Sequence, residues 1–468
     1  MSDALEERSA TELLALLRRR QVSAVELTRS FLARIERVDK HINSYITVTA
    51  DAALRDARRL DRLRSRRGVL HGLPLAVKDL FATQGVRTTA GSKILANWVP
   101  RFDATVVARL RAAGAILLGK LNMHEFAYGT TTNNPHYGPT RNPWNLDCVP
   151  GGSSGGSGAA VAAGLCAAAL GTDTGGSIRI PAAACGVVGL KPTYGRVSRC
   201  GVVPLSWSLD HVGPLTKTVE DAALLLTVLA GVDANDPTCS SRRVDNYRAA
   251  LRRSVRGLKL GVPREYFFDL LDDGVRAAFD AALDTFKRLG MRVQPVSIPS
   301  VAQSQAAELA IMMPEATAYH ARHLASRATD YGADVRTFLE MGRLVPATTM
   351  VAAQRLRARL AAECVQAFER VDAIIVPSLP VGAPRIADNF IQIAGVSVDA
   401  ATALSHNMMP FNLSGLPVVA VPCGRSAAGL PIGLQVAGRA FDEATVLRIA
   451  HAYERATDWH TLRPPLRK

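Results

Sequence analysis

Two short apolar runs with a helix-like segment between them place the strongest constraint on the fold of this chain. The runs GLPLAVKDLF at 72–81 and GAILLGKLN at 114–122 are bounded by glycine, as is typical of strands buried on both faces of a sheet. The segment 103–114 that separates them has a helical pattern and ends on a glycine. A strand, a helix and a strand in this order predict an α/β fold with a layered core.

Helical patterns precede and follow these strands. We expect Ser9 or Thr11 to cap a helix through ELLALLRRR, and Ser23 to cap a second helix with Glu26 as its capping-box partner. The alanine-rich run 158–170 predicts a helix whose small side chains allow close packing. Further helices are expected through much of 275–370, and further strands at 258–263, 372–380, 416–424 and 431–438.

Composition and charge narrow the class of protein. Apolar residues make up 48% of the 468 residues and charged residues 21%, as in a folded enzyme rather than a disordered chain. The net charge of +15 raises the question of nucleic-acid binding, but the basic residues are spread along the sequence. The densest basic cluster, at 58–67, contains two aspartates and is typical of a solvated helix face. Nucleic acid is therefore not expected as a partner.

The cysteines and the N-terminal residues bear on the cellular compartment in which the protein is expected. The seven cysteines form no C-x-x-C pair and no cysteine–histidine spacing, which argues against a disulfide framework or structural zinc and favours a reducing compartment. The acidic N-terminus lacks the apolar core of a signal peptide, and the weakly polar run 158–171 is too short to span a bilayer. We expect a cytoplasmic protein that does not enter the membrane.

A glycine–serine segment, PGGSSGGSG at 150–158, is followed by the related stretch GTDTGGSIRIP at 171–181. A flexible linker is excluded because the first segment runs directly into an apolar, helix-forming stretch. A phosphate loop at 114–121 is excluded because Leu121 stands where a Ser or Thr would hold magnesium. Lys120 in that run is interpreted as a surface residue at a strand end.

Nucleophilic catalysis is the remaining interpretation of these glycines and serines. Residues 151–155 match G-x-S-x-G, the nucleophile elbow of α/β-hydrolases. That mechanism would need a histidine and an acid later in the chain, such as His406 with Asp372, although neither lies in a recognisable setting. A catalytic site in which a residue other than histidine activates the serine is the alternative.

Three separated motifs, GLPLAVKD, PGGSSGGS and GTDTGGSIRIPAAACGVVGLKPTYGRVS, occur in this order and continue into NLSGLPVVAVPCG and GLPIGLQVAG. Together they closely resemble the amidase signature family, most densely across a signature core at 70–220. The resemblance implies a single α/β domain, 1–468, with a central mixed β-sheet covered by helices and an N-terminal helical segment at 1–65. It implies no metal, nucleotide or redox cofactor.

The same resemblance implies a Ser–Ser–Lys triad of Lys78, Ser153 and Ser177. Ser177 would be the nucleophile, and Ser153 would relay its proton to Lys78. Because Lys78 ends the apolar run LPLAV, we expect burial to lower its pKa and make it a base. The alternative is an ordinary ion pair between Lys78 and Asp79 at the end of a strand.

Backbone groups around the two serines complete the expected site. The resemblance implies a cis peptide bond before Ser153, in a turn that Gly151 and Gly152 make sterically accessible. It also implies an oxyanion hole formed by the backbone N–H groups of Ser177 and of the three residues before it, Thr174, Gly175 and Gly176. The residues expected to support these loops are Gly152, Ser154, Asp173 and Arg179.

A variable region at about 300–410 is expected to line the substrate pocket. It contains six of the nine methionines, whose flexible side chains suit an irregular apolar pocket; ordinary filling of the core is the alternative. The resemblance implies an amidase, a hydrolase of linear non-peptide C–N bonds, and we expect it to act as a stand-alone enzyme. It would act through a serine acyl-enzyme on aryl or alkyl amides, anilides or carbamates (urethanes). Its expected partner is a small-molecule substrate, and a homodimer is one expected assembly.

The alternative function is the glutaminase A subunit of a tRNA-dependent glutamyl/aspartyl amidotransferase, which KPTYGRVS resembles. That subunit usually carries an acidic residue, which holds the α-amino group of glutamine, at the position of Ser405. No Asp or Glu occurs at 400–422, so the stand-alone amidase is preferred. A basic binding protein without turnover is disfavoured because the full triad is present.

Overall fold

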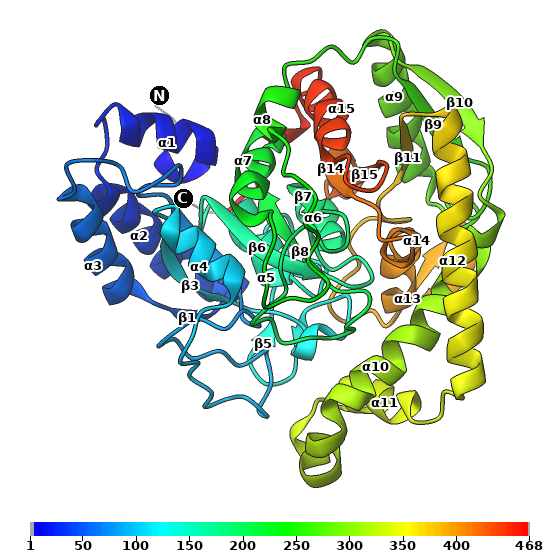
Figure 1. The fold of residues 1–468 in the computed structure, drawn as a ribbon, viewed down its shortest axis with the longest axis horizontal. Helices are drawn as coiled ribbons and strands as arrows, with labels where there is room; N and C mark the ends of the chain where they lie inside the picture. Colours follow the sequence, from blue (N-terminus) through cyan, green and yellow to red (C-terminus); the bar gives the residue numbers. More distant parts are fainter. Residues whose placement is uncertain (1–3, 467–468) are drawn as a thin grey trace.

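One mixed sheet forms the centre of the protein (Figure 1). The computed structural model describes residues 4–466, and within them eleven strands join this sheet while two short hairpins stand apart from it. The strands of the sheet are β1 Tyr45–Val48, β2 Pro74–Lys78, β3 Ile116–Leu121, β6 Ala168–Asp173, β7 Val188–Lys191, β8 His211–Thr216, β9 Lys259–Pro263, β10 Arg292–Val296, β11 Ala373–Pro377, β14 Val418–Arg425 and β15 Pro431–Ala437; the hairpins are β4 Asn133–Asn134 with β5 Gly138–Pro139, and β12 Phe390–Ile393 with β13 Val396–Asp399.

The strands follow the order β1-β3-β2-β6-β8-β7-β14-β15-β11-β9-β10. β2 runs parallel to both β3 and β6, and β9 runs parallel to β10 and β11. The pairs between β6 and β11 are antiparallel, so the sheet is mixed. The predicted α/β fold with a central mixed sheet covered by helices is confirmed.

Helices flank the sheet and extend beyond both of its ends (Figure 1). Those of the N-terminal segment lie near the β1 edge, and the long helices that follow β10 lie at the opposite end. The helices are α1 Ala10–Arg18, α2 Ala24–Ile42, α3 Ala50–Asp61, α4 Thr105–Ala112, α5 Gly155–Ala162, α6 Arg179–Cys185, α7 Val219–Leu229, α8 Tyr247–Ala250, α9 Asp273–Arg288, α10 Ser304–Arg327, α11 Ala333–Gly342, α12 Ala347–Arg370, α13 Ala400–Ser405, α14 Met409–Leu413 and α15 Glu443–Arg455, with short 3₁₀ helices at Leu5–Glu7, Glu125–Ala127, Pro299–Gln303, Ala328–Asp330 and Trp459–Thr461.

Local sequence signals set the start of the first helices. The Ser9 hydroxyl accepts the backbone N–H of Glu12, whose carboxylate accepts the N–H of Ser9, and Ser23 forms the same capping box with Glu26. Each box satisfies two N–H groups that have no partner within the helix. Ser9, rather than Thr11, is therefore the cap of α1.

The alanine-rich run 158–170 does not form one helix. α5 ends at Ala162, and the last alanines belong to β6, which lies between β2 and β8. Helix propensity is a weak local preference, and the backbone hydrogen bonds of β6 to both neighbouring strands outweigh it. This change of structure places the chain after β6 at the end of the sheet where β2 also ends.

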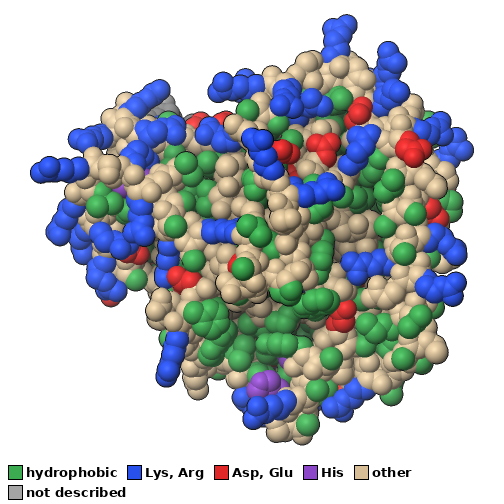
Figure 2. Space-filling view, in the orientation of Figure 1, with side chains coloured by type: hydrophobic (Ala, Val, Ile, Leu, Met, Phe, Trp, Pro, Cys, Tyr) green, Lys and Arg blue, Asp and Glu red, His purple; other side chains and the backbone are tan. Residues whose placement is uncertain are grey.

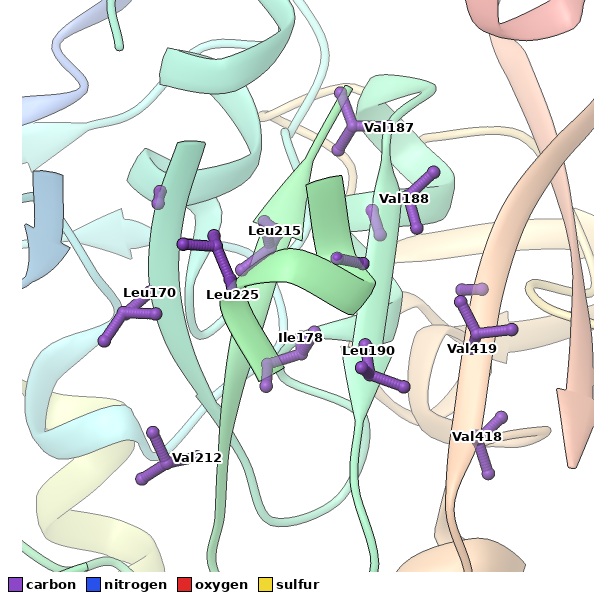
Figure 3. Packing of buried hydrophobic residues seen from close by; sticks show 14 of the residues in the cluster. Leu170, Ile178, Val187, Val188, Leu190, Val212, Leu215, Leu225, Val418 and Val419 are labelled. Carbon is purple, nitrogen blue, oxygen red and sulfur yellow. The ribbon is translucent and has the colours of Figure 1, made fainter. Parts of the chain in front are cut away.

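A tightly packed core fixes the position of that loop (Figure 3). Ile178, which directly follows Ser177, is fully buried and packs among apolar side chains of β6, β7 and β8. Its neighbours in this cluster include Leu190 and Leu215. Because close-packed interiors resist displacement, the core holds the residue beside Ser177 in place.

Basic side chains are distributed over the face shown in Figure 2 rather than gathered into one patch. Lys and Arg side chains surround the visible outline, with apolar surface between them. In the described part of the chain, no helix combines the length and apolar character needed to cross a membrane.

Candidate active site

Lys78 is the last residue of β2, and its side chain is fully buried. Its Nζ lies 2.7 Å from the Oγ of Ser153 and 2.9 Å from the Oγ1 of Thr172. Burial lowers the pKa of Lys78 to about 7, although the negative charges of Asp210 and Asp173 oppose this shift. A large fraction of the amine is therefore neutral near neutral pH and can accept a proton.

Asp79 does not pair with Lys78. Its carboxylate accepts the backbone N–H and the hydroxyl of Thr89, and its other oxygen lies 3.6 Å from the Nζ of Lys120. Lys120 is therefore a buried residue and not the surface residue expected from the sequence; it also donates to the Thr88 hydroxyl at 2.7 Å. The separate pairing of Asp79 leaves Lys78 directed at Ser153.

Ser153 follows a cis peptide bond with Gly152, in a completely buried turn. Its carbonyl accepts the backbone N–H of His124 at 3.1 Å. A Cβ atom on Gly152 would lie 2.8 Å from the backbone of Thr130, so a larger residue does not fit there. Gly151 has φ of +78°, a conformation that favours glycine.

Ser177 lies between the end of β6 and the start of α6, and 5% of its surface is exposed. Its carbonyl accepts the backbone N–H of Ser154 at 3.2 Å. The Ser154 hydroxyl in turn donates to the backbone carbonyl of Thr172 at 3.2 Å. The side chain of Thr172, like that of Ser153, accepts a hydrogen bond from Lys78. These bonds join the two glycine-rich loops and bring the three residues of the expected triad into one buried region.

Asp173 organises the loop that carries Ser177. Its carboxylate accepts the backbone N–H groups of Gly176 at 2.9 Å and Ile178 at 3.1 Å, and two guanidinium bonds from Arg179 at 3.0 Å each. Burial alone would raise the pKa of Asp173, but the charge and hydrogen bonds of Arg179 outweigh it and hold that pKa well below its usual value. Asp173 is therefore a permanent anion around which the loop turns.

Arg179 connects this loop to the C-terminal part of the chain. It is fully buried and also donates to the side chains of Gln435 at 2.7 Å and Asn412 at 2.6 Å, and to the carbonyl of Met408 at 3.0 Å. Neither Gln435 nor Asn412 was expected at the site from the sequence. The available signal was their place inside the two C-terminal motifs, NLSGLPVVAVPCG and GLPIGLQVAG.

The residues expected to bind an oxyanion precede Ser177 in a tightly packed turn. The N–H of Gly176 already donates to Asp173, and the Thr174 hydroxyl donates to the Asp210 carboxylate at 2.6 Å. Gly176 has φ of +117°, and a Cβ there would lie 2.6 Å from the Cβ of Met408. The turn therefore has no room for a side chain at Gly176.

The histidine and acid considered for a nucleophile elbow lie in other settings. The His406 ring stacks on Tyr266 with 4.0 Å between ring centroids, and burial lowers the pKa of His406. Asp372 instead accepts the backbone N–H of Lys259 at 2.8 Å. The side chain next to Ser153 is Lys78, which favours the arrangement without histidine. No group of three or more potential metal-ligating His, Cys, Asp or Glu side chains occurs within residues 4–466.

The methionines of the variable region do not form one pocket lining. Met408 and Met409 lie beside Gly176 and Gly175, within reach of the proposed reaction centre. Met341, by contrast, is 44% exposed at the end of α11. The methionines near Ser177 therefore come from the start of α14, where Met408 is the N-cap and Met409 the first residue.

Comparison with known proteins identifies the family. The Amidase family model matches residues 26–447, and the chain belongs to this family. It is 45% identical to the A subunit of glutamyl-tRNA(Gln) amidotransferase from Geotalea daltonii, with 97% of this chain and 98% of that protein covered.

Solved structures show the same relationship. The A subunit of glutamyl-tRNA(Gln) amidotransferase from Thermotoga maritima matches with a TM-score of 0.85 and 37% identity, and all of both chains is covered. A chain from a vestigial protein complex, described as revealing the evolutionary origins of an s-triazine catabolic enzyme, matches with a TM-score of 0.92 and 39% identity over 96% of this chain and 98% of that one.

These relatives correct two expectations. They support the alternative function, the A subunit, better than the stand-alone amidase with an apolar substrate. The prediction of a small-molecule partner only, with nucleic acid not expected, is wrong because the similar proteins are named as subunits of an enzyme acting on glutamyl-tRNA. The even spread of arginines along the sequence was the misleading signal, since charge distribution alone does not identify such an assembly.

Proposed function

We propose that this chain is the amide-hydrolysing A subunit of a tRNA-dependent amidotransferase. In that assembly it would release ammonia from an amide donor for transfer to the glutamyl group of glutamyl-tRNA. The observation that carries the proposal is the 45% identity to such a protein over nearly the full length of both chains. The buried contact between Lys78 and Ser153 supplies matching chemistry.

In the proposed mechanism, neutral Lys78 accepts the proton of Ser153 while Ser153 takes the proton of Ser177. The Ser177 oxygen then attacks the carbonyl carbon of the amide. The 2.7 Å separation between Lys78 and Ser153 is short enough for direct proton transfer. Ser153 is thus a relay rather than a nucleophile.

Negative charge develops on the former carbonyl oxygen after the attack. Because the N–H of Gly176 donates to Asp173, we assign the stabilisation of this charge to the N–H groups of Thr174, Gly175 and Ser177. The C–N bond breaks as Ser153 passes a proton to the nitrogen, and ammonia leaves. Water then hydrolyses the acyl group on Ser177 by the same proton route in reverse.

The test is reconstitution with the other subunits of the amidotransferase from the same organism. The complete assembly should convert glutamyl-tRNA(Gln) to glutaminyl-tRNA(Gln) with glutamine as the amide donor, and Ser177→Ala should abolish the glutamine-dependent reaction. Added ammonium should restore product with this variant, because only ammonia release is lost. Efficient hydrolysis of amides by the chain alone, with no glutaminyl-tRNA(Gln) formed by the assembly, would contradict the proposal.

A stand-alone amidase is the second candidate function. One observation favours it: no Asp or Glu occurs at 400–422, where the A subunit is expected to hold the amino group of glutamine. The Ser405 hydroxyl donates to carbonyls within its own helix, α13, at 3.1 and 3.2 Å. An aryl amide or carbamate hydrolysed faster than glutamine would support this candidate.

A further inference from the structure

Glu308 is a buried acid to which the mechanism gives no role. It lies in the second turn of α10, and its side chain has no exposed surface. Within the described part of the chain, neither carboxyl oxygen has a hydrogen-bond partner. Leaving a carboxyl buried and unpaired is costly, and binding of a ligand is one explanation for keeping such a group.

The carboxyl of Glu308 is directed at the loop that carries the proposed nucleophile. A Cβ atom built on Gly175 would lie 2.5 Å from its Oε1 and 3.5 Å from the terminal methyl of Met409. Gly175 precedes Ser177 by two residues and is one of the proposed oxyanion donors. The acid therefore lies against the loop that the proposed mechanism uses to bind the substrate carbonyl.

The two arginines whose charges act on Glu308 are already committed to other groups. Arg179 donates to Asp173, Gln435, Asn412 and a carbonyl oxygen. Arg357 donates to the carbonyl of Leu413 at 2.9 Å and to that of Ser208 at 3.0 Å, and neither arginine forms an ion pair with Glu308 within residues 4–466.

Burial raises the pKa of Glu308 well above its usual value, more than the positive charges of Arg179 and Arg357 lower it. The nearby anion Asp173 adds to the rise. Burial therefore favours the neutral form of this carboxyl, and a cationic group placed against it would favour the charged form.

The acid that the A subunit is expected to use for the amino group of glutamine is absent from this chain. Ser405 stands at its position, and the serine hydroxyl is used within α13. α10 and α13 contact each other, because the Gln305 side chain donates to the carbonyl of Thr402 at 3.3 Å. The helix that carries Glu308 therefore lies against the helix that carries Ser405.

We propose that Glu308 is the specificity residue that binds the amino group of the amide donor, in place of the missing acid at Ser405. The inference rests on the proposed function. The donor is then an amino-acid amide, and its ammonium group pairs with the Glu308 carboxylate while the carboxyl proton leaves to solvent. Met409 contacts the aliphatic part of the same donor.

The first measurement compares glutamine with glutaramate, the analogue that lacks the amino group, as sources of ammonia in the reconstituted assembly. The wild type should favour glutamine in kcat/KM by about tenfold to a hundredfold, as expected for a charge-assisted hydrogen bond. Glu308→Gln should remove most of this preference, mainly through KM for glutamine, and should leave glutaramate hydrolysis nearly unchanged. Glu308→Asp, which keeps the charge, should retain part of the preference.

Glu315→Gln is the matched control. Glu315 lies seven residues further along α10, but its carboxylate already accepts the hydroxyl of Ser206 and the N–H of Ser208 at 3.0 Å. This variant should keep the wild-type preference for glutamine. If Glu308→Gln also keeps the preference for glutamine over glutaramate, the inference about Glu308 is wrong. The proposed function would still stand in that case, provided that the assembly releases ammonia from glutamine.

A second measurement does not depend on turnover. A fluorophosphonate modifies activated serines, and the measurement is how well glutamate, or glutarate, which lacks the amino group, slows the modification of Ser177. Glutamate should protect the wild type at about one tenth of the glutarate concentration or less, and Glu308→Gln should show no difference. If no amide is hydrolysed but this difference persists, the proposed function fails and the role of Glu308 stands; equal protection of the wild type by both compounds refutes that role.

Discussion

Modification of Ser177 by a fluorophosphonate should follow the ionisation of Lys78. Only the neutral amine can take the proton that Ser153 relays, so the labelling rate is proportional to the neutral fraction of Lys78. Burial lowers the pKa of Lys78 to about 7. Below that pH the amine is mostly protonated and labelling slows; above it the amine is mostly neutral and the rate reaches a plateau.

The expected size of the effect follows from this pKa. About a tenth of the amine is neutral at pH 6 and about nine tenths at pH 8, so the rate should rise about tenfold over this interval and little beyond it. A solvated lysine has a pKa near 10.4 and would give an increase of about a hundredfold over the same interval, with no plateau below pH 10. The shape of the profile therefore distinguishes a buried base from an exposed one.

The assay measures second-order labelling rates of the purified chain between pH 5.5 and about 9.5, with the modified peptide identified by mass spectrometry. Lys78→Met should lose labelling throughout. Lys217→Gln is the control, because Lys217 is also buried and its pKa is lowered to about 8. Its amine donates to the carbonyl of Arg8 at 3.0 Å, and it follows the end of β8 opposite to the end that pairs with Asp173. A buried Lys78 base is ruled out if the wild-type rate is flat across pH 6–8, climbs steadily through pH 9, or shifts with Lys217→Gln.

Two further predictions concern the loop around Ser177. Arg179→Met should lower the free energy of unfolding by about 3–5 kcal/mol in urea titrations, because it leaves the Asp173 carboxylate buried without its cation; a loss below about 1 kcal/mol would show that this ion pair is not required. Gly176→Ala should slow fluorophosphonate labelling at least tenfold, because its φ is +117° and its new Cβ would lie 2.6 Å from Met408. The matched substitution Gly257→Ala, where φ is +84° and no atom lies within 4 Å of the new Cβ, should cost only about 1 kcal/mol and leave labelling unchanged; equal labelling by both variants would contradict the steric argument.

Features that depend on neighbouring residues could be predicted from the amino-acid sequence alone. The capping boxes at Ser9 and Ser23 formed because each needs only a residue three positions away. The buried strands on either side of α4 formed as their apolar runs indicated. The apolar run before Lys78 indicated a buried amine but left the ion pair with Asp79 open, and the family resemblance favoured the buried base.

Features that depend on contacts between distant segments required the folded chain. The end of the alanine-rich run became β6 because two strands flank it, and Lys120 became buried because Asp79 and Thr88 surround its amine. Arg179 donates hydrogen bonds to Asn412 and Gln435, which lie more than two hundred residues further along the sequence. Glu308 reaches the loop of Ser177 only through the packing of α10. Burial and pairing of a charge depend on every segment that surrounds it, and no local pattern of residues records that environment.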